Sequence, residues 1–197
     1  MNKAMKITIS RIIIAVIIII LLLFPFYQVG YTFPTYLVNG NILVDLRYII
    51  AGILFIIASF TDYLDGHVAR KYNIVSEFGK VIDAIADKIL TNSLLIILAA
   101  NGMISAIIPV VIIVRDTFTD AMKMVIGSKS NAVGAIYLAK VKTATLMVGM
   151  ALTLFYNLPF ELLGIRVSDF LLIVAAVLSV VSGVKYYLMA KPYLQEK

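Results

Sequence analysis

The chain has 197 residues, of which 62% are hydrophobic and 14% are charged, and its mean hydropathy is +1.01. This composition excludes an ordinary water-soluble domain and predicts an all-α, integral membrane bundle of transmembrane helices. The net charge is +6, but the basic residues are distributed between apolar segments, so we expect no nucleic-acid partner. The chain contains no cysteine, which excludes thiol catalysis.

Six apolar segments are long enough to be helices that cross a bilayer. In chain order they cover residues 8–29, 47–72, 76–100, 105–126, 133–156 and 168–190. Residues 30–46 are expected to form a loop, because they include proline, asparagine and glycine. A cleaved signal peptide is the alternative for the first segment, but no small-residue cleavage site follows it. Residues 1–197 are therefore predicted to form one transmembrane domain of six spans.

The basic residues indicate how this bundle is oriented. Six spans put both termini on the same side of the membrane as the loops after the second and fourth spans. All but two of the 17 Lys and Arg residues belong to that side, and the two exceptions are Arg47 and Arg166. Because positive charge is enriched on the cytoplasmic side of membrane proteins, we expect a multi-pass protein of the cell membrane with cytoplasmic N- and C-termini.

Four aspartates lie beside the apolar runs, where the second span ends and the third begins. Asp62 and Asp65 share one face of the second helix, and Asp83 and Asp87 share one face of the third. If the segment between the two helices turns tightly, the two pairs meet at matching depths, because each helix rises about 1.5 Å per residue. Four carboxylates are therefore expected to converge at the cytoplasmic end of the bundle.

Such a cluster of like charges has to take up protons or hold cations. Carboxylate oxygens suit Mg²⁺ or Mn²⁺, and the site has enough of them for two ions. The small residues Gly66, Ala69 and Gly79 leave space beside the ions, and Arg70 can grip a phosphate with two hydrogen bonds. The residues thus indicate phosphoryl-transfer chemistry. The alternative is a structural polar seam between two helices.

The same residues carry a family resemblance. The pattern resembles the signature of the CDP-alcohol phosphotransferase family without a gap or substitution, and it reads Asp62-x2-Asp65-Gly66-x2-Ala69-Arg70-x8-Gly79-x3-Asp83-x3-Asp87. The resemblance extends over nearly the whole chain. It implies a phospholipid-biosynthetic enzyme that transfers a phosphatidyl group from CDP-diacylglycerol to an alcohol and releases CMP.

The resemblance also implies roles for individual residues. Asp62, Asp65 and Asp83 would mainly be metal ligands, whereas Asp87 would be both a ligand and the base that takes the proton of the acceptor hydroxyl. The expected contacts to CDP-diacylglycerol are Thr8, Asp62, Gly66, Ala69, Arg70, Ser76 and Gly79. A homodimer is common in the family, although no feature of this sequence indicates one.

Four basic residues are candidates for binding the acceptor, namely Arg115, Lys123, Lys140 and Lys142. Arg115 lies deep inside an apolar span, so it is more than a topology signal. The alternative is that it pairs with Asp116 or Asp120 while the lysines extend to the membrane surface.

The segments RDTFTDAMKM and AKVKT resemble those of the phosphatidylglycerophosphate synthases within the family, with Lys123 and Ala139 in place of arginine and glycine. At the N-terminus Thr8 and Arg11 match the family pattern, but Ala4-Met5 replaces Pro-Asn. A small phosphorylated alcohol, glycerol 3-phosphate, is therefore the expected acceptor.

Three other functions stay open at this stage. Another acceptor, such as inositol phosphate, phosphatidylglycerol or an amino alcohol, would keep the aspartate site and change the pocket. An intramembrane prenyltransferase also uses aspartates and Mg²⁺, but its motifs lie on helices far apart in a longer chain. A non-enzymatic cation carrier would need polar residues across the whole membrane depth, and the apolar run 94–100 has none.

Overall fold

The computed structural model of the chain describes residues 3–72, 77–129 and 136–194, with the side chains of all of these except residues 3–7, 62–72, 77–78, 80 and 128–129. This part of the chain forms six α-helices, two short 3₁₀ helices and one β-hairpin. In chain order they are α1 (Lys3–Leu23), η1 (Phe26–Val29), β1 (Thr35–Val38), β2 (Ile42–Asp45), α2 (Leu46–Tyr72), α3 (Glu77–Ala100), α4 (Ile107–Lys129), α5 (Tyr137–Leu154), η2 (Phe160–Leu163) and α6 (Val167–Leu194). The prediction of an all-α fold with six helices is confirmed.

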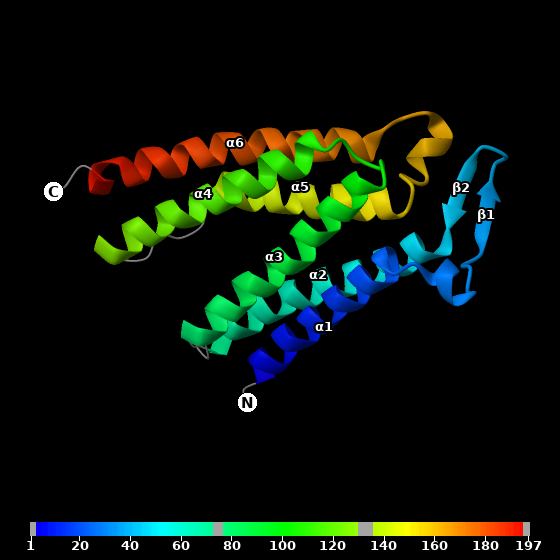
Figure 1. Cartoon of the computed structure of the whole chain (residues 1–197). Coiled ribbons are helices and arrows are strands. Elements are labelled where there is room, and N and C mark those ends of the chain that lie inside the picture. Colours follow the sequence, from blue (N-terminus) through cyan, green and yellow to red (C-terminus); the bar gives the residue numbers. More distant parts are fainter. Residues whose placement is uncertain (1–2, 73–76, 130–135, 195–197) are drawn as a thin grey trace.

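The helices form two groups of three (Figure 1). In the first group α1 packs along both α2 and α3, and in the second α6 packs along both α4 and α5. Contacts of α2 with α5 and of α3 with α4 join the groups. The shared core contains Phe55 of α2, Leu94 and Leu98 of α3, and Met150 of α5, all almost completely buried. Gly149 allows α5 to approach α6, because a β-carbon there would lie 2.9 Å from Leu172.

The first helix begins and ends earlier in the chain than the sequence predicted. It ends at Leu23 instead of continuing to residue 29. The reason is Pro25, which has no backbone N–H to donate and disfavours a helical conformation in the residue before it. The chain then makes the short turn η1, which closes at Gly30 with a φ of 77°. The prediction that this α-helix continues through residues 24–29 was wrong, because residues 26–29 form a separate 3₁₀ helix.

A β-hairpin lies where a loop was expected. β1 and β2 are antiparallel, with Tyr36 opposite Val44 and Leu37 opposite Leu43. Asn39 and Gly40 both have positive φ, 51° and 74°, which is the backbone geometry of the tight turns that connect hairpin strands. The prediction of a loop was therefore wrong for residues 35–38 and 42–45, which form the two strands. The Asn39-Gly40 pair is the sequence signal that identifies the turn between them.

The outer surfaces of the helices are largely apolar. On α6 a stripe of exposed side chains at helical spacing includes Phe170, Ile173, Val177, Val180 and Val184. Within the described residues α6 is the one helix that is both long and apolar enough to cross a membrane, and α1 and α2 contribute the shorter apolar segments Thr8–Leu23 and Leu46–Thr61. Six membrane spans therefore stay a prediction.

The hairpin is tied to the second helix group through Tyr156. The backbone N–H of Asp45 donates a hydrogen bond to the Tyr156 hydroxyl (3.0 Å), and the rings of Tyr48 and Tyr156 meet edge to face. The Asp45 carboxylate also caps α2, because it accepts a hydrogen bond from the Arg47 backbone N–H (2.8 Å). Burial raises the pKa of the Tyr156 hydroxyl above its ordinary value of 10.0.

The substitution Tyr156→Phe should lower the free energy of unfolding by about 1–3 kcal/mol, because the Asp45 N–H loses its acceptor. Thermal unfolding of the purified protein in detergent measures this change. Because burial raises the pKa of the hydroxyl, folding favours its protonated form, and this part of the stability is present below pH 10 and is lost as the pH rises through the raised pKa, although the ionised oxygen still accepts the Asp45 hydrogen bond. The difference between the two proteins should therefore shrink in strong alkali. Tyr36→Phe, which changes an exposed tyrosine, should have no effect at any pH.

Candidate functional site

The predicted aspartate site lies where α2 ends and α3 begins. The two helices run in opposite directions, and these ends lie on the side of the molecule away from the hairpin (Figure 1). The last turns of α2 carry Asp62, Asp65, Gly66, Ala69 and Arg70, and the first turns of α3 carry Gly79, Asp83 and Asp87. Ser76 lies outside the described residues, as do the side chains of residues 62–72. The convergence of all four carboxylates therefore stays a prediction.

The described half of this site includes a buried arginine. Arg11 of α1 is 1% exposed, and its Nη1 donates to Oδ1 of Asp83 (2.9 Å), a carboxylate that is half exposed. Thr8, one turn earlier on α1, is also buried. The first helix therefore positions Asp83 through an ion pair with a buried arginine. Sequence reasoning matched Arg11 to a family pattern and assigned it no role in the site, although an arginine inside an apolar helix was a signal for one.

The donor chemistry of the site fits a divalent cation. Asp83 and Asp87 are one turn apart on α3, and carboxylate oxygens are the ligands that Mg²⁺ and Mn²⁺ prefer. Among the side chains that the structure describes, no three His, Cys, Asp or Glu residues lie close enough to hold a metal ion. Two of the four predicted ligands, Asp62 and Asp65, fall outside those side chains, so the metal site stays a prediction.

Two of the four basic residues predicted to bind the acceptor meet at one carboxylate. Arg115 of α4 donates from Nη1 to Oδ1 of Asp116 (2.6 Å), and Lys142 of α5 donates to both oxygens of Asp116 (3.0 and 2.9 Å). Arg115 and Lys142 are almost completely buried, with 11% and 6% of their side chains exposed. Nη2 of Arg115 also donates to the hydroxyl of Ser182 on α6 (2.5 Å). Three helices therefore build this cluster.

Tyr186 of α6 extends the cluster to a third cation. The Arg115 guanidinium lies 5.9 Å and the Lys123 ammonium 5.1 Å from the centre of its fully buried ring. The Tyr186 hydroxyl accepts a hydrogen bond from the backbone N–H of Ile136, just before α5 (3.2 Å). Lys140 is exposed in the first turn of α5 and takes no part in these described contacts. Sequence reasoning missed both Ser182 and Tyr186, because neither carries a charge.

A second carboxylate joins the two helix groups near the aspartate site. Asp120 of α4 pairs with Lys88 of α3, and Lys123 lies 3.9 Å from the same carboxylate. Asp120 and Asp116 are one turn apart on α4. The ion pairs of Asp120 with Lys88 and Lys123, and the contact of Lys123 with the Tyr186 ring, thus connect this region of α3 with the basic cluster of α4–α6.

Comparison with known proteins identifies the family. The sequence model of the CDP-alcohol phosphatidyltransferases matches residues 1–181. This chain belongs to that family.

Similar members of the CDP-alcohol phosphatidyltransferase family come from several bacteria. A protein of Bacillus subtilis (strain 168) is 37% identical over 186 residues, which cover 94% of this chain and 93% of that protein. A protein of Rickettsia felis is 31% identical over 145 residues, 73% of this chain and 80% of its own length. A protein of Mycoplasma genitalium is 42% identical over 115 residues, 58% of this chain and 49% of its own length. All three are named CDP-diacylglycerol–glycerol-3-phosphate 3-phosphatidyltransferase.

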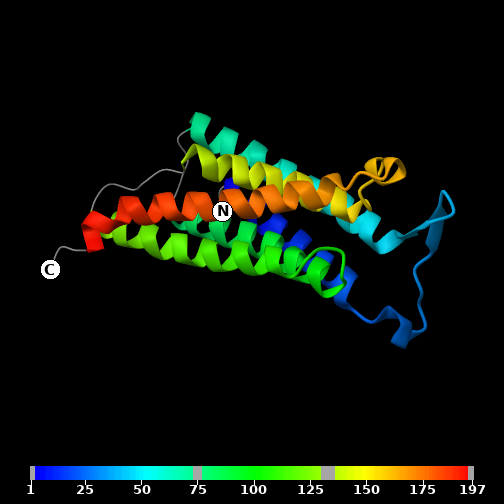
Figure 2. The same cartoon turned by 90° about the horizontal axis from the view of Figure 1, so that it is seen from above.

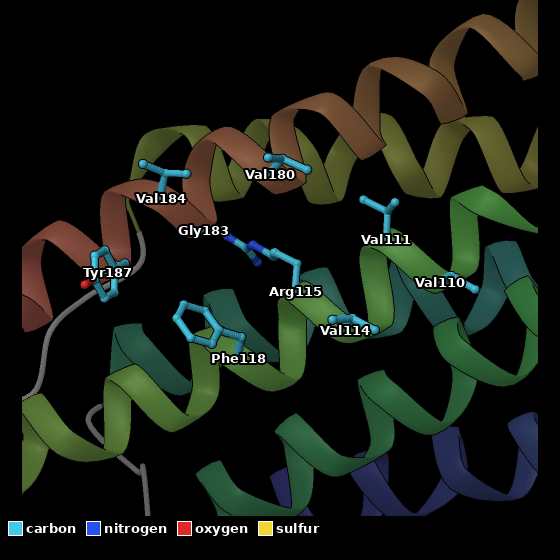
Figure 3. A pocket seen from close by; sticks show the side chains of 9 residues that line it. All are labelled: Val110, Val111, Val114, Arg115, Phe118, Val180, Gly183, Val184 and Tyr187. Atoms are coloured by element: carbon cyan, nitrogen blue, oxygen red, sulfur yellow. The ribbon is translucent and has the colours of Figure 1, made fainter.

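This CDP-alcohol phosphatidyltransferase has an apolar groove on the far side of Arg115. The groove lies between α4 and α6 and has a volume of about 520 Å³ (Figure 3). Its lining is formed by Val110, Val111, Val114, Arg115, Phe118, Val180, Gly183, Val184 and Tyr187. A β-carbon at Gly183 would lie 3.0 Å from the side chain of Arg115. The glycine thus makes room for the arginine to cross from α4 to α6, with its charged end turned towards Asp116.

The substitution Asp116→Asn should lower the free energy of unfolding by about 3 kcal/mol, because it leaves two buried cations without their anion. Thermal unfolding in detergent measures the loss. The matched control is Asp169→Asn, which removes an exposed carboxylate 3.9 Å from Arg166 and should cost less than about 1 kcal/mol. An equally small loss in both variants would show that the cluster contributes no more than a surface ion pair.

Proposed function

We propose that this protein transfers the phosphatidyl group of CDP-diacylglycerol to glycerol 3-phosphate and releases CMP. The observation that carries the proposal is the match to a Bacillus subtilis enzyme with this name, which is 37% identical over 94% of this chain and 93% of its own. The intact family signature in α2 and α3 supports the reaction type, and the buried basic cluster of α4–α6 supports an acceptor that carries a phosphate.

The four aspartates would hold the divalent cations, with Asp62 and Asp65 on α2 and Asp83 and Asp87 on α3. Mg²⁺ or Mn²⁺ held there would supply positive charge to offset the negative charge of the pyrophosphate and of the leaving CMP. Arg11 would help to hold Asp83 in position from inside the bundle, because its buried guanidinium donates to that carboxylate (2.9 Å).

The side chains on the facing turns would bind the donor. Arg70 would hold a phosphate of the CDP group, and Thr8, Asp62 and Ser76 would offer it polar contacts. Gly66, Ala69 and Gly79 would leave room for it beside the carboxylates. Asp87 would accept the proton of the acceptor hydroxyl as the new phosphate ester forms. A carboxylate is a weak base for an alcohol, so the proton would move late in the reaction.

The acceptor phosphate would lie beside Arg115, Lys123 and Lys142. Arg115 and Lys142 share the single carboxylate of Asp116, whereas Lys123 lies near Asp120, so the Arg115–Lys142 pair has one positive charge left over for an anion. A neutral alcohol would leave that surplus without a counter-ion in a largely buried site. Lys140, exposed at the start of α5, would meet the acceptor as it enters.

We also infer that the chain crosses the cell membrane six times with its termini and aspartates on the cytoplasmic side. The apolar outer surface of the helices and the length of α6 support this arrangement. Both chain ends lie on the side away from the hairpin, as do the aspartate-bearing ends of α2 and α3 (Figure 1). The basic residues are concentrated in the segments on that side. A homodimer stays a prediction from the family resemblance.

The decisive experiment measures CMP release from CDP-diacylglycerol by purified protein with a series of acceptors. Glycerol 3-phosphate should support turnover, and glycerol, serine and inositol phosphate should not. Chelation should stop the reaction, and added Mg²⁺ or Mn²⁺ should restore it. Asp65→Asn should lower the rate by at least about 100-fold with unchanged thermal unfolding. Turnover with inositol phosphate and not with glycerol 3-phosphate would show that inositol phosphate is the acceptor. If no acceptor led to CMP release, the proposal that the protein is this enzyme would be wrong.

Lys142→Ala tests the acceptor site. It should raise KM for glycerol 3-phosphate by about tenfold or more and leave KM for CDP-diacylglycerol within about twofold, because a phosphate loses a charged hydrogen bond. Lys185→Ala, which removes an exposed lysine of α6, is the matched control and should change neither value. Equal increases in both KM values would show that Lys142 supports the fold of the site and does not bind the acceptor.

A further inference from the structure

The segment between α1 and α2 forms a cap at the end of the molecule opposite the aspartate-bearing helix ends (Figures 1 and 2). We define this aromatic cap as residues 24–45, which include η1 and the β-hairpin. The sequence has no charged residue between Arg11 and Asp45. A loop in water normally carries charge, so this cap has the wrong composition for a segment surrounded by water.

The aromatic side chains of the cap pack into a fixed cluster. Phe26 meets Phe24 and Phe33 edge to face, with ring centres 4.9 and 5.1 Å apart, and Phe33 meets Tyr31 in the same way at 4.9 Å. The guanidinium of Arg47, in the first turn of α2, lies 6.0 Å from the centre of the Phe33 ring. The cap is therefore a shaped apolar surface that is joined to α2.

Much of that surface faces outwards. Tyr27, Tyr31 and Tyr36 are each more than half exposed. In the hairpin, Leu37 and Leu43 are directly opposite each other, and their side chains are 63% and 61% exposed. Leu37 and Leu43 therefore form an exposed apolar pair on one face of the hairpin.

Two opposing costs determine where such a cap is stable. Exposed tyrosine and leucine side chains on this scale are unfavourable in water. However, the described sheet has only two strands, so each strand has an outer edge of backbone N–H and C=O groups that no third strand pairs. In the hydrocarbon core of a bilayer each such group would cost several kcal/mol. Only the layer of lipid head groups and glycerol esters accepts both the apolar side chains and the polar edges.

We propose that the aromatic cap docks into the interfacial layer of the outer leaflet and binds phospholipids there. This inference rests on the membrane location proposed above. The tyrosine rings lie at the level of the glycerol esters with their hydroxyls towards the head groups, and Leu37 and Leu43 insert below them. The helices on either side of the cap, α1 and α2, also expose apolar side chains such as Ile20 and Ile53. The cap thereby sets the depth of the two helices that carry Thr8, Arg11 and the first aspartates.

The chain has no tryptophan, so a single introduced one reports its own surroundings. Leu37→Trp is made in the full-length protein and reconstituted into phosphatidylcholine–phosphatidylglycerol vesicles. Its fluorescence should be shifted to the blue relative to tryptophan in water. Lipids brominated near the head group should quench it more than lipids brominated near the end of the acyl chain. Leu43→Trp, its cross-strand neighbour, should give the same depth.

Two results would overturn the inference. Quenching by aqueous iodide without quenching by brominated lipid would place the cap in water. Blue-shifted emission that neither quencher reduces would show that protein covers the cap, such as a second copy of the chain. Val180→Trp, on the exposed stripe of α6, is the control for membrane insertion and should be quenched best by deeply brominated lipid. If Val180→Trp inserts into the membrane and the protein still releases CMP, either of these two results contradicts only the docking of the cap and leaves the proposed function unaffected.

Discussion

A charge placed inside an apolar bundle has to be paired, and this requirement organises both halves of the molecule. Arg11 is buried in α1 and directs its guanidinium to Asp83 of α3. Arg115 and Lys142 are buried in α4 and α5 and share Asp116. Because a buried cation without an anion is costly, each pair limits how the helices can rotate and slide against each other. The charged side chains proposed for metal and substrate binding are thus held in position by the same contacts that stabilise the fold.

The two groups of helices divide the proposed reaction between them. The group α1–α3 carries the aspartates and the residues expected to bind CDP-diacylglycerol, and the group α4–α6 carries the basic cluster that we propose for the acceptor phosphate. α6 has a supporting part in the second group, since Ser182 and Tyr186 hold Arg115, Lys123 and the start of α5. The ion pair between Lys88 and Asp120 joins the groups near the aspartates. Donor and acceptor would therefore meet between the two groups of helices.

The two ends of the molecule differ in chemistry. One end has the aspartates, most of the basic residues and both chain ends, whereas the other has an aromatic cap whose only charged residue is Asp45, and an α5–α6 connection anchored by Tyr156. This difference suits a protein whose soluble substrates arrive from one side only. The proposed docking of the cap in the outer leaflet would hold the bundle at a constant depth while lipid substrate and product exchange at the inner end.

The sequence alone was sufficient for the all-α class, the number of helices and the reaction family, because these depend on local patterns such as apolar runs and the spacing from Asp62 to Asp87. It also contained the signals for the end of α1 at Pro25 and for the hairpin turn at Asn39-Gly40, which were read as continued helix and as loop. The pairing of Arg115 with Asp116 was one of the alternatives that the sequence left open, and the structure confirms it. The sequence did not indicate that Arg11 meets Asp83, or that Lys142 joins Arg115 at Asp116. Helical spacing defines only which residues share a face of one helix. Which faces meet depends on how all six helices pack, and only the tertiary structure decides that.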